Sequence, residues 1–145
     1  MHQLTNLTAL EELDLQYNNM DELQIPQDAF PCIHTLHLSF NRIPREHLCT
    51  LGNLQSLQVL NLAANNLSYL PSDLSFFHSL QELNLSQNNF GDDSQDMGPG
   101  KNVGAIFRAL TSIPLLRKLN LSRNKLSHFH TEHLPEQNQR HNAQL

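Results

Sequence analysis

The chain of 145 residues has the size of one ordinary domain, and its 14 acidic residues against 9 Lys and Arg give a net charge of −5. This balance, with an isoelectric point near 5.9, disfavours a nucleic-acid-binding protein, because phosphate contacts need clustered cations. No apolar run approaches the roughly 20 residues of a membrane-spanning helix, which disfavours a membrane span as well.

Five copies of one phrase follow one another along the chain. They begin at residues 10, 33, 57, 80 and 116, so consecutive copies are 23, 24, 23 and 36 residues apart. Each copy reads Leu-x-x-Leu-x-Leu-x-x-Asn-x-Leu, and Ile, Met and Phe are the only departures at its apolar positions. The Leu-x-Leu step predicts a short strand in every copy, because alternate side chains of a strand lie on the same face.

This phrase resembles the leucine-rich repeat family, and the resemblance extends over residues 4–134. It implies an α/β fold, a solenoid shaped as a right-handed horseshoe, with short parallel strands on the concave side and short helices, turns and loops on the convex side. One repeat alone buries too little apolar surface to offset the ordering of its backbone, so the copies must stack. We expect one repeat domain over residues 1–134, made of a partial N-terminal repeat and five complete ones.

An asparagine occupies the ninth position of every copy, where the chain turns inward over the leucine core. An amide side chain offers two donors and an acceptor to backbone groups removed from water, and an unpaired buried polar group costs about 1–3 kcal/mol. The stacked copies therefore predict an internal ladder of amides with a structural role. Its members are Asn18, Asn41, Asn65, Asn88 and Asn124.

The segments that return from one strand to the next also show apolar patterns. Residues 43–57 have a helical spacing, with Pro44 at a position that the first turn of a helix tolerates. Residues 67–80 place apolar side chains three or four positions apart, and Pro71 limits any helix before it. The convex side is therefore predicted to mix short helices with turns.

The fourth repeat has 36 residues, 13 more than the usual 23, because its return segment carries an insertion. The inserted residues 91–102 are polar and interrupted by Gly and Pro. We expect a mobile loop there. The residues that follow resume a helical spacing, which should bury Ile106, Phe107 and Leu110. Asn102 is a candidate N-cap of this helix.

The two ends of the array differ from its middle. Residues 4–10 match the end of a return segment whose strand is missing. An open solenoid end exposes its core, so we interpret the chain as a monomeric module of a longer protein. Residues 135–145 offer only Leu145 for burial and are expected to be a disordered polar tail.

No motif favours an enzyme, a metal or a cofactor. The histidine-rich segment 128–133 has metal-ligating residue types, but the repeat rhythm turns its histidines outward with nothing to fix them. Neither a phosphate-binding loop nor a nucleophile on a sharp turn is recognisable. Cys32 and Cys49 are too few for a disulfide scaffold, so we expect inert packing thiols and a non-catalytic protein.

The solvent-side positions around the five strands form the candidate binding site. They are acidic in the first copy, small and neutral in the middle, and basic in the last. A parallel sheet is normally covered on both faces, so a free strand face with graded charge suits a protein partner. The candidate residues are Glu12, Asp14, Gln16, His37, Ser39, Val59, Asn61, Ala63, Glu82, Asn84, Ser86, Lys118, Asn120, Ser122 and Arg123.

Within the family, residues 38–52 and 67–74 resemble an intracellular array linked to the response to X-ray radiation. The resemblance implies a cytoplasmic and nuclear location. Related intracellular arrays are phosphatase regulators or ciliary scaffolds, and an extracellular receptor ectodomain is a further alternative that glycans on Asn-x-Ser/Thr sequons would favour. The sequons begin at Asn6, Asn66, Asn84 and Asn120.

Overall fold

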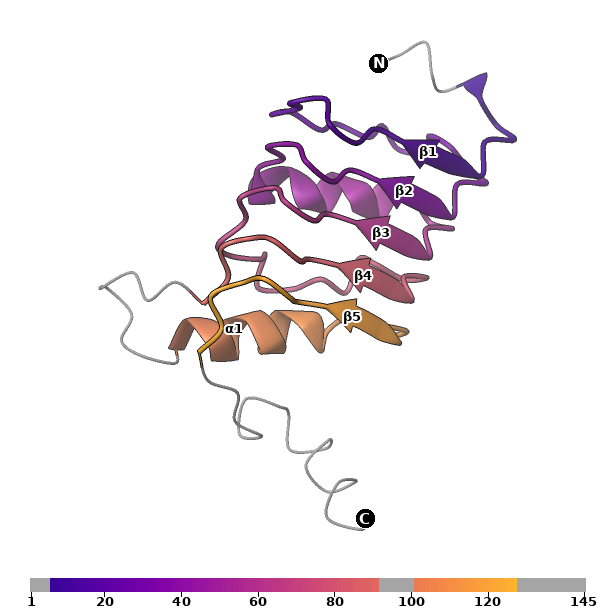
Figure 1. The fold of residues 1–145 in the computed structure, drawn as a ribbon. Helices are drawn as coiled ribbons and strands as arrows, with labels where there is room; N and C mark the ends of the chain where they lie inside the picture. The colour runs from indigo at the N-terminus through magenta and orange to yellow at the C-terminus, as the bar shows by residue number, and fades with distance from the viewer. Residues whose placement is uncertain (1–5, 92–100, 128–145) are drawn as a thin grey trace.

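The computed structural model describes residues 6–91 and 101–127. Within them, five strands form one parallel sheet in chain order (Figure 1). The strands are β1 (Glu12–Asp14), β2 (Thr35–His37), β3 (Val59–Asn61), β4 (Glu82–Asn84) and β5 (Lys118–Asn120). Every strand lies at the Leu-x-Leu step of one copy, so the predicted solenoid of short parallel strands is confirmed.

The register of the sheet aligns the central leucines of the five strands, which are Leu13, Leu36, Leu60, Leu83 and Leu119. Leu36 and Leu60 are each 1% exposed, whereas Leu119 at the edge of the sheet is 37% exposed. The difference follows from stacking, because a coil of the solenoid buries its leucines fully only when coils cover it on both sides.

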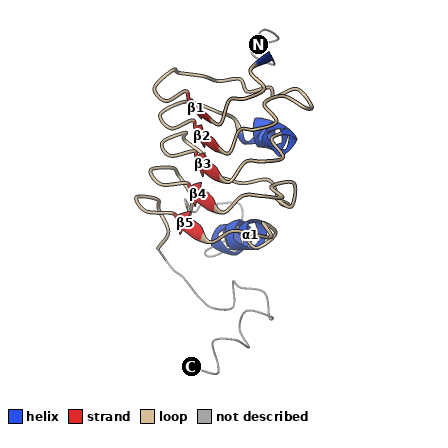
Figure 2. Cartoon of the chain, turned by 90° about the vertical axis from the view of Figure 1, so that its right-hand side faces the viewer, coloured by secondary structure: helices blue, strands red, loops and turns tan. Residues whose placement is uncertain are grey.

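Both described helices lie on the same side of the sheet (Figure 2). The first is the 3₁₀-helix η2 (Arg45–Asn53), which buries Leu48 and Leu51 against the core. Pro44 precedes this helix as its N-cap residue and is not part of its first turn. Residues 67–80 form no helix, although their spacing suggested one. Pro71 lacks an N–H donor and clashes with the preceding turn, so no helix runs through it.

The second helix, α1 (Lys101–Leu110), follows the insertion. Ile106 and Leu110 are 2% and 3% exposed, and Phe107 packs against the core while partly buried. Asn102 is the second residue of this helix, so the prediction that it caps the helix is wrong. The helix starts earlier than expected because its apolar face, and not the capping residue, fixes its position against the core.

Gly91, where the insertion starts, lies against the last coil. Its φ is +86°, and a Cβ atom at this position would lie 2.8 Å from the backbone oxygen of Lys125. Only glycine fits both the left-handed backbone and this close approach. Residues 92–100 of the predicted loop, the tail over residues 135–145 and the histidine-rich segment 128–133 lie outside the described residues. Lys101 and Asn102 were assigned to the loop but belong to α1, so the predicted end of the loop is wrong.

The asparagines at the ninth position of the copies join consecutive coils. Oδ1 of Asn65 accepts a hydrogen bond from the backbone N–H of Ile43 (3.0 Å), and its Nδ2 donates to the backbone oxygen of Leu38 (3.0 Å). Asn41 and Asn88 make the equivalent bonds to the coil that precedes each of them. These three side chains are buried, so they satisfy backbone groups that water does not reach.

The first and last asparagines of the ladder have fewer neighbours. Asn18 is exposed, and its Nδ2 donates to the backbone oxygens of Leu15 and Gln16 in its own turn (both 2.9 Å). Asn124 is half-buried, and its Oδ1 accepts from the backbone N–H of Phe90 (3.1 Å). An internal position was expected for Asn18, but the described residues include no strand before β1 that would cover it.

Cys32 and Cys49 are free thiols, and both are exposed. The expectation that they pack in the interior is therefore wrong. In η2 the core side is taken by Leu48 and Leu51, so Cys49 points outward and its thiol donates to the backbone oxygen of Glu46 (3.2 Å).

Candidate functional site on the strand face

The strand face lies opposite the helices, and no described helix covers it (Figure 2). A shallow groove of about 320 Å³ crosses it from β2 to β5, and we name it the central groove. Its lining consists of strand residues alone. They are His37, Val59, Leu60, Asn61, Glu82, Leu83, Asn84, Lys118, Leu119 and Asn120.

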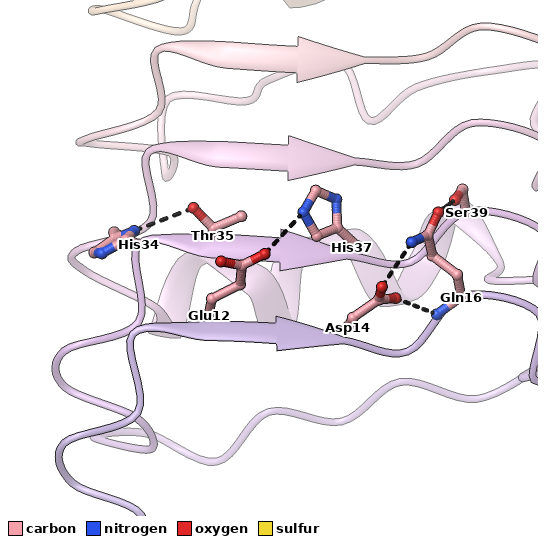
Figure 3. A network of polar contacts seen from close by, with 7 residues as sticks. All are labelled: Glu12, Asp14, Gln16, His34, Thr35, His37 and Ser39. Atoms are coloured by element: carbon pink, nitrogen blue, oxygen red, sulfur yellow. Dashed lines mark hydrogen bonds and ion pairs between the residues drawn. The ribbon is translucent and has the colours of Figure 1, made fainter.

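A polar network lies beside the groove, on β1 and β2 (Figure 3). Oε1 of Glu12 is 3.5 Å from Nε2 of His37. The carboxylate of Asp14 accepts two hydrogen bonds from Gln16, one from the backbone N–H (3.0 Å) and one from the side-chain amide (2.8 Å). The hydroxyl of Ser39 donates to the side-chain oxygen of Gln16.

Hydrogen bonds in this network favour the ionised form of Asp14. The backbone and side-chain hydrogen bonds from Gln16, with a smaller contribution from the nearby His37, lower the pKa of the Asp14 carboxyl group below its ordinary value. The carboxylate of Asp14 is exposed and its geometry is fixed. It therefore offers an oriented negative charge at one end of the strand face.

In four copies, the side chain that follows the central leucine of the strand bonds to the backbone of its own coil. A side-chain oxygen accepts a hydrogen bond of 3.0 Å from the backbone N–H two residues later, at Asp14, Asn61, Asn84 and Asn120. His37 departs from this pattern, and its Nδ1 is buried without a hydrogen-bond partner among the described residues. Sequence reasoning missed this role, although Asp or Asn at this position in four copies was an available signal.

Three predicted binding residues are buried instead of facing solvent. Ser39, Ala63 and Ser86 are 2%, 4% and 5% exposed. They follow the strands at a position where backbone hydrogen bonds still join the coils, so their small side chains are enclosed by the coils on either side. The corresponding residues of the end coils are more open, since Gln16 is half-buried and Ser122 is exposed.

Arg123 is not on the strand face proper, because it belongs to the turn that follows each strand. We name this position the turn row, and all five of its residues have φ between +53° and +59°. A left-handed backbone directs a side chain away from the alternation of the strand. The turn row consists of Tyr17, Phe40, Ala64, Gln87 and Arg123.

Two members of the turn row form an exposed aromatic pair. The rings of Tyr17 and Phe40 stack with their centroids 4.3 Å apart and their planes at 9°. Sequence reasoning did not single out this pair. Aromatic residues at the eighth position of two consecutive copies were the signal for it.

Charge is graded along the stack, because the coils follow chain order. Residues 6–41 contain six acidic residues and no Lys or Arg, whereas residues 101–127 contain six Lys and Arg and no acidic residue. Part of the positive end is paired, since Nζ of Lys118 lies 2.6 Å from Oε1 of Glu82. Both partners are solvent-exposed, so this pair contributes little to stability.

The described residues hold no group of three His, Cys, Asp or Glu side chains placed to bind a metal ion. Over the same part of the chain, every helix is too short or too polar to cross a membrane.

Similarity to known proteins agrees with the fold. Family models described as leucine-rich repeat match residues 31–90 and 115–136. X-ray radiation resistance-associated protein 1 of Mus musculus is 28% identical over 130 residues, which are 81% of this chain and 16% of that protein. The flightless-1 homolog of Caenorhabditis elegans is 31% identical over 123 residues, 83% of this chain and 9% of that protein. Chaoptin of Tribolium castaneum is 39% identical over 59 residues, 41% of this chain and 8% of that protein.

Solved structures show the same architecture. The Toll chain of the Toll–Spatzle complex of Drosophila superposes with a TM-score of 0.65 at 19% identity, covering 86% of this chain and 15% of that one. An internalin of Listeria monocytogenes gives a TM-score of 0.56 at 24% identity, covering 90% of this chain and 36% of that one. The chain spans 16% or less of the length of the curated relatives named above. With its five strands in register and repeat models that match on both sides of the insertion, the chain belongs to the leucine-rich repeat family.

Proposed function

We propose that this chain is a non-catalytic interaction module that binds a protein partner along its strand face. The observation that carries the proposal is the central groove, which crosses four of the five strands on a face that no described helix covers. A pre-formed polar surface of this kind binds without a large cost of ordering. The contact residues are Glu12, Asp14, Gln16, His37, Val59, Asn61, Glu82, Asn84, Lys118, Asn120 and Ser122.

The chemistry of the groove fits a polypeptide. Asn61, Asn84 and Asn120 use their Oδ1 atoms inside their own coils, and their Nδ2 groups are the donors on this face that can meet carbonyl oxygens of a partner. Half-buried Val59 adds an apolar contact in the middle of the face. Fixed donors around an apolar centre are typical of protein interfaces.

Site-specific photo-crosslinking in cells tests this surface. A photoreactive amino acid replaces Asn61 in the full-length protein, and a matched variant carries it at Gln55, which is exposed just after η2. We expect the same partner to be crosslinked reproducibly from position 61 and not from position 55. Adducts from position 55 alone, or from neither position, would contradict binding along the strand face.

For the cellular context, we propose an intracellular protein, cytoplasmic and nuclear, that is linked to the response to X-ray radiation. The support is the similarity to the mouse X-ray radiation resistance-associated protein 1 over 81% of the chain. Cells that lack the protein should survive X-rays differently from the parent line, and the wild-type protein should restore survival. An Asn61→Arg variant that folds normally should fail to do so if the strand face is needed. Equal survival of deleted and parental cells would refute this context.

An extracellular receptor ectodomain is the second candidate function. The sequon residues Asn6 and Asn66 are exposed on the surface, and the superposed Toll chain is part of a complex with Spatzle. Mass spectrometry of peptides from the natural protein distinguishes the two candidates. Glycans on Asn6 or Asn66 would favour the receptor, and unmodified asparagines would favour the intracellular protein.

A further inference from the structure

The stacked pair of Tyr17 and Phe40 is an aromatic surface held open to solvent, and we name it the aromatic platform. Tyr17 is 70% exposed and Phe40 is 38% exposed, which sets them apart from the leucines that make up most of the core. Exposed aromatic rings cost solvation free energy that burial would recover. The two rings therefore offer a ready contact to a partner.

The platform is rigid and adjoins the strand face. The backbone N–H of Tyr17 donates to the oxygen of Ser39 (3.1 Å), and the N–H of Phe40 donates to the oxygen of Ala63 (2.9 Å). These bonds join three consecutive coils at the turn row, one residue beyond the strand-face network that Figure 3 shows at Gln16 and Ser39. A ligand would meet pre-arranged rings without a large ordering cost.

The charge near the platform is negative on the first coil. All six acidic residues of positions 6–41 are exposed and this stretch contains no Lys or Arg, whereas the exposed Arg42 lies two residues after Phe40 on the second coil. The face of an aromatic ring carries negative potential as well, and it attracts cations. The acidic residues are Glu11, Glu12, Asp14, Asp21, Glu22 and Asp28.

We propose that the aromatic platform binds an arginine side chain from a basic segment of the protein partner. The inference rests on the proposed function and adds the chemistry of the bound segment. A guanidinium plane lies flat on the outer ring, and the exposed carboxylates of the first coil attract its positive charge. Within the described residues, a cation–π contact is already present, because the guanidinium carbon of Arg45 lies 5.6 Å from the ring centroid of Tyr69.

The opposite end of the array fixes the direction of binding. Arg117, Lys118 and Arg123 are exposed there, and no acidic residue occurs in positions 101–127. A basic segment is repelled at that end and attracted at the platform. The basic part of the partner thus lies over β1 and β2, and its neutral or acidic part lies toward β5.

Titration of the full chain followed by nuclear magnetic resonance tests the platform. The probe is the peptide acetyl-Gly-Arg-Gly-Arg-Gly-amide, with versions that carry Lys or Glu in place of Arg. We expect the Arg peptide to shift the ring resonances of Tyr17 and Phe40 and to bind more tightly than the Lys peptide, because a planar guanidinium stacks on a ring and an ammonium does not. The Glu peptide should leave the rings unchanged.

Two variants at the turn row provide the control. Tyr17→Leu keeps an apolar side chain and should weaken the Arg peptide about two- to five-fold, whereas Gln87→Leu, with the same left-handed backbone, should leave its affinity unchanged. Unshifted ring resonances, or equal losses in the two variants, would overturn the inference. The ring resonances of Tyr17 and Phe40 are also followed against protein concentration in the absence of peptide. Shifts that grow with concentration, and that are lost in the Lys118→Glu variant, would overturn the inference, because the platform would then bind the basic end of a second copy of this chain.

The proposed function and this inference fail separately. If a partner is crosslinked from position 61 but the platform does not respond to the Arg peptide, the interaction module is supported and the arginine-binding platform is refuted. If the platform binds the Arg peptide but no partner is crosslinked, the strand-face interaction module is refuted instead.

Discussion

The buried asparagine side chains act at the scale of single residues. Each joins the backbone of its own turn to the coil before it, so one side chain satisfies several groups that water cannot reach. At the solvent side, Asp14 makes a comparable bond to a backbone N–H, but in contact with water. The same kind of hydrogen bond therefore matters more in the interior than on the surface.

Replacing Asn65 by Leu should lower the free energy of unfolding by about 1–3 kcal/mol, because it leaves the buried N–H of Ile43 without a partner and removes one of the two side-chain hydrogen bonds that the oxygen of Leu38 accepts. Urea unfolding of the two proteins measures the difference. Asn18→Leu is the matched control, and it should change stability by less than about 0.5 kcal/mol, since water reaches the groups that exposed Asn18 bonds. Equal effects of both substitutions would refute the structural ladder.

The carboxyl group of Asp14 should titrate below the ordinary aspartate pKa, because hydrogen bonds from Gln16 favour its charged form. Its folded-state pKa is depressed, so its contribution to stability is present above the unfolded pKa and disappears as the pH falls through the folded value. Carboxyl chemical shifts followed against pH measure the midpoint. The Gln16→Ala variant keeps the backbone N–H, which is the larger cause, and loses only the side-chain amide, so it should raise that midpoint part of the way. A midpoint that returns fully to the ordinary aspartate value would contradict the role of the backbone hydrogen bond.

At the scale of elements, the helices are held by apolar contacts and not by their ends. In η2 the buried side chains are Leu48 and Leu51, and the N-cap residue Pro44 makes no side-chain capping bond. Helix α1 likewise begins before the residue that looked like its cap. Apolar spacing predicted that both segments are helical, but their starts were misplaced. Pro44 is the N-cap and not a first-turn residue, and Asn102 lies inside its helix and does not cap it.

Leu51→Ala in η2 should cost about 2–5 kcal/mol of unfolding free energy, because Leu51 is 0% exposed and its removal leaves a cavity. Cys49→Ala in the same helix should stay within about 0.5 kcal/mol, since the thiol is exposed. Thermal unfolding by circular dichroism gives both values. A loss for Cys49→Ala as large as that for Leu51→Ala would mean that η2 packs through a different side.

For the whole molecule, stability is shared between neighbouring coils. The central leucines of the inner strands are almost fully buried, whereas Leu119 on the outermost strand is 37% exposed. The contribution of a leucine therefore depends on its place in the stack, although its place in the repeat is the same. The charge gradient is also a property of the stack, because the six acidic residues of positions 6–41 and the six Lys and Arg of positions 101–127 lie on coils at opposite ends of the array.

Leu60→Ala should destabilise the protein by about 2–5 kcal/mol, whereas Leu119→Ala should cost about 1 kcal/mol. The two leucines occupy the same position of the repeat, so local structure is matched. Chemical unfolding monitored by circular dichroism compares them. If both substitutions cost the same, burial by neighbouring coils would not be the main source of stability.

The repeat, its short parallel strands and the ninth-position asparagines can be predicted from the amino-acid pattern, because a short-range period fixes which side chains must turn inward. The burial of Ser39, Ala63 and Ser86 and the exposed pair of Tyr17 and Phe40 cannot be predicted in this way and are seen in the folded chain. These properties depend on how tightly one coil lies on the next and on the left-handed backbone of the turn row. The sequence pattern of one repeat does not give the distance between neighbouring coils. Which side chains are exposed on the binding surface can therefore be known only from the stacked structure.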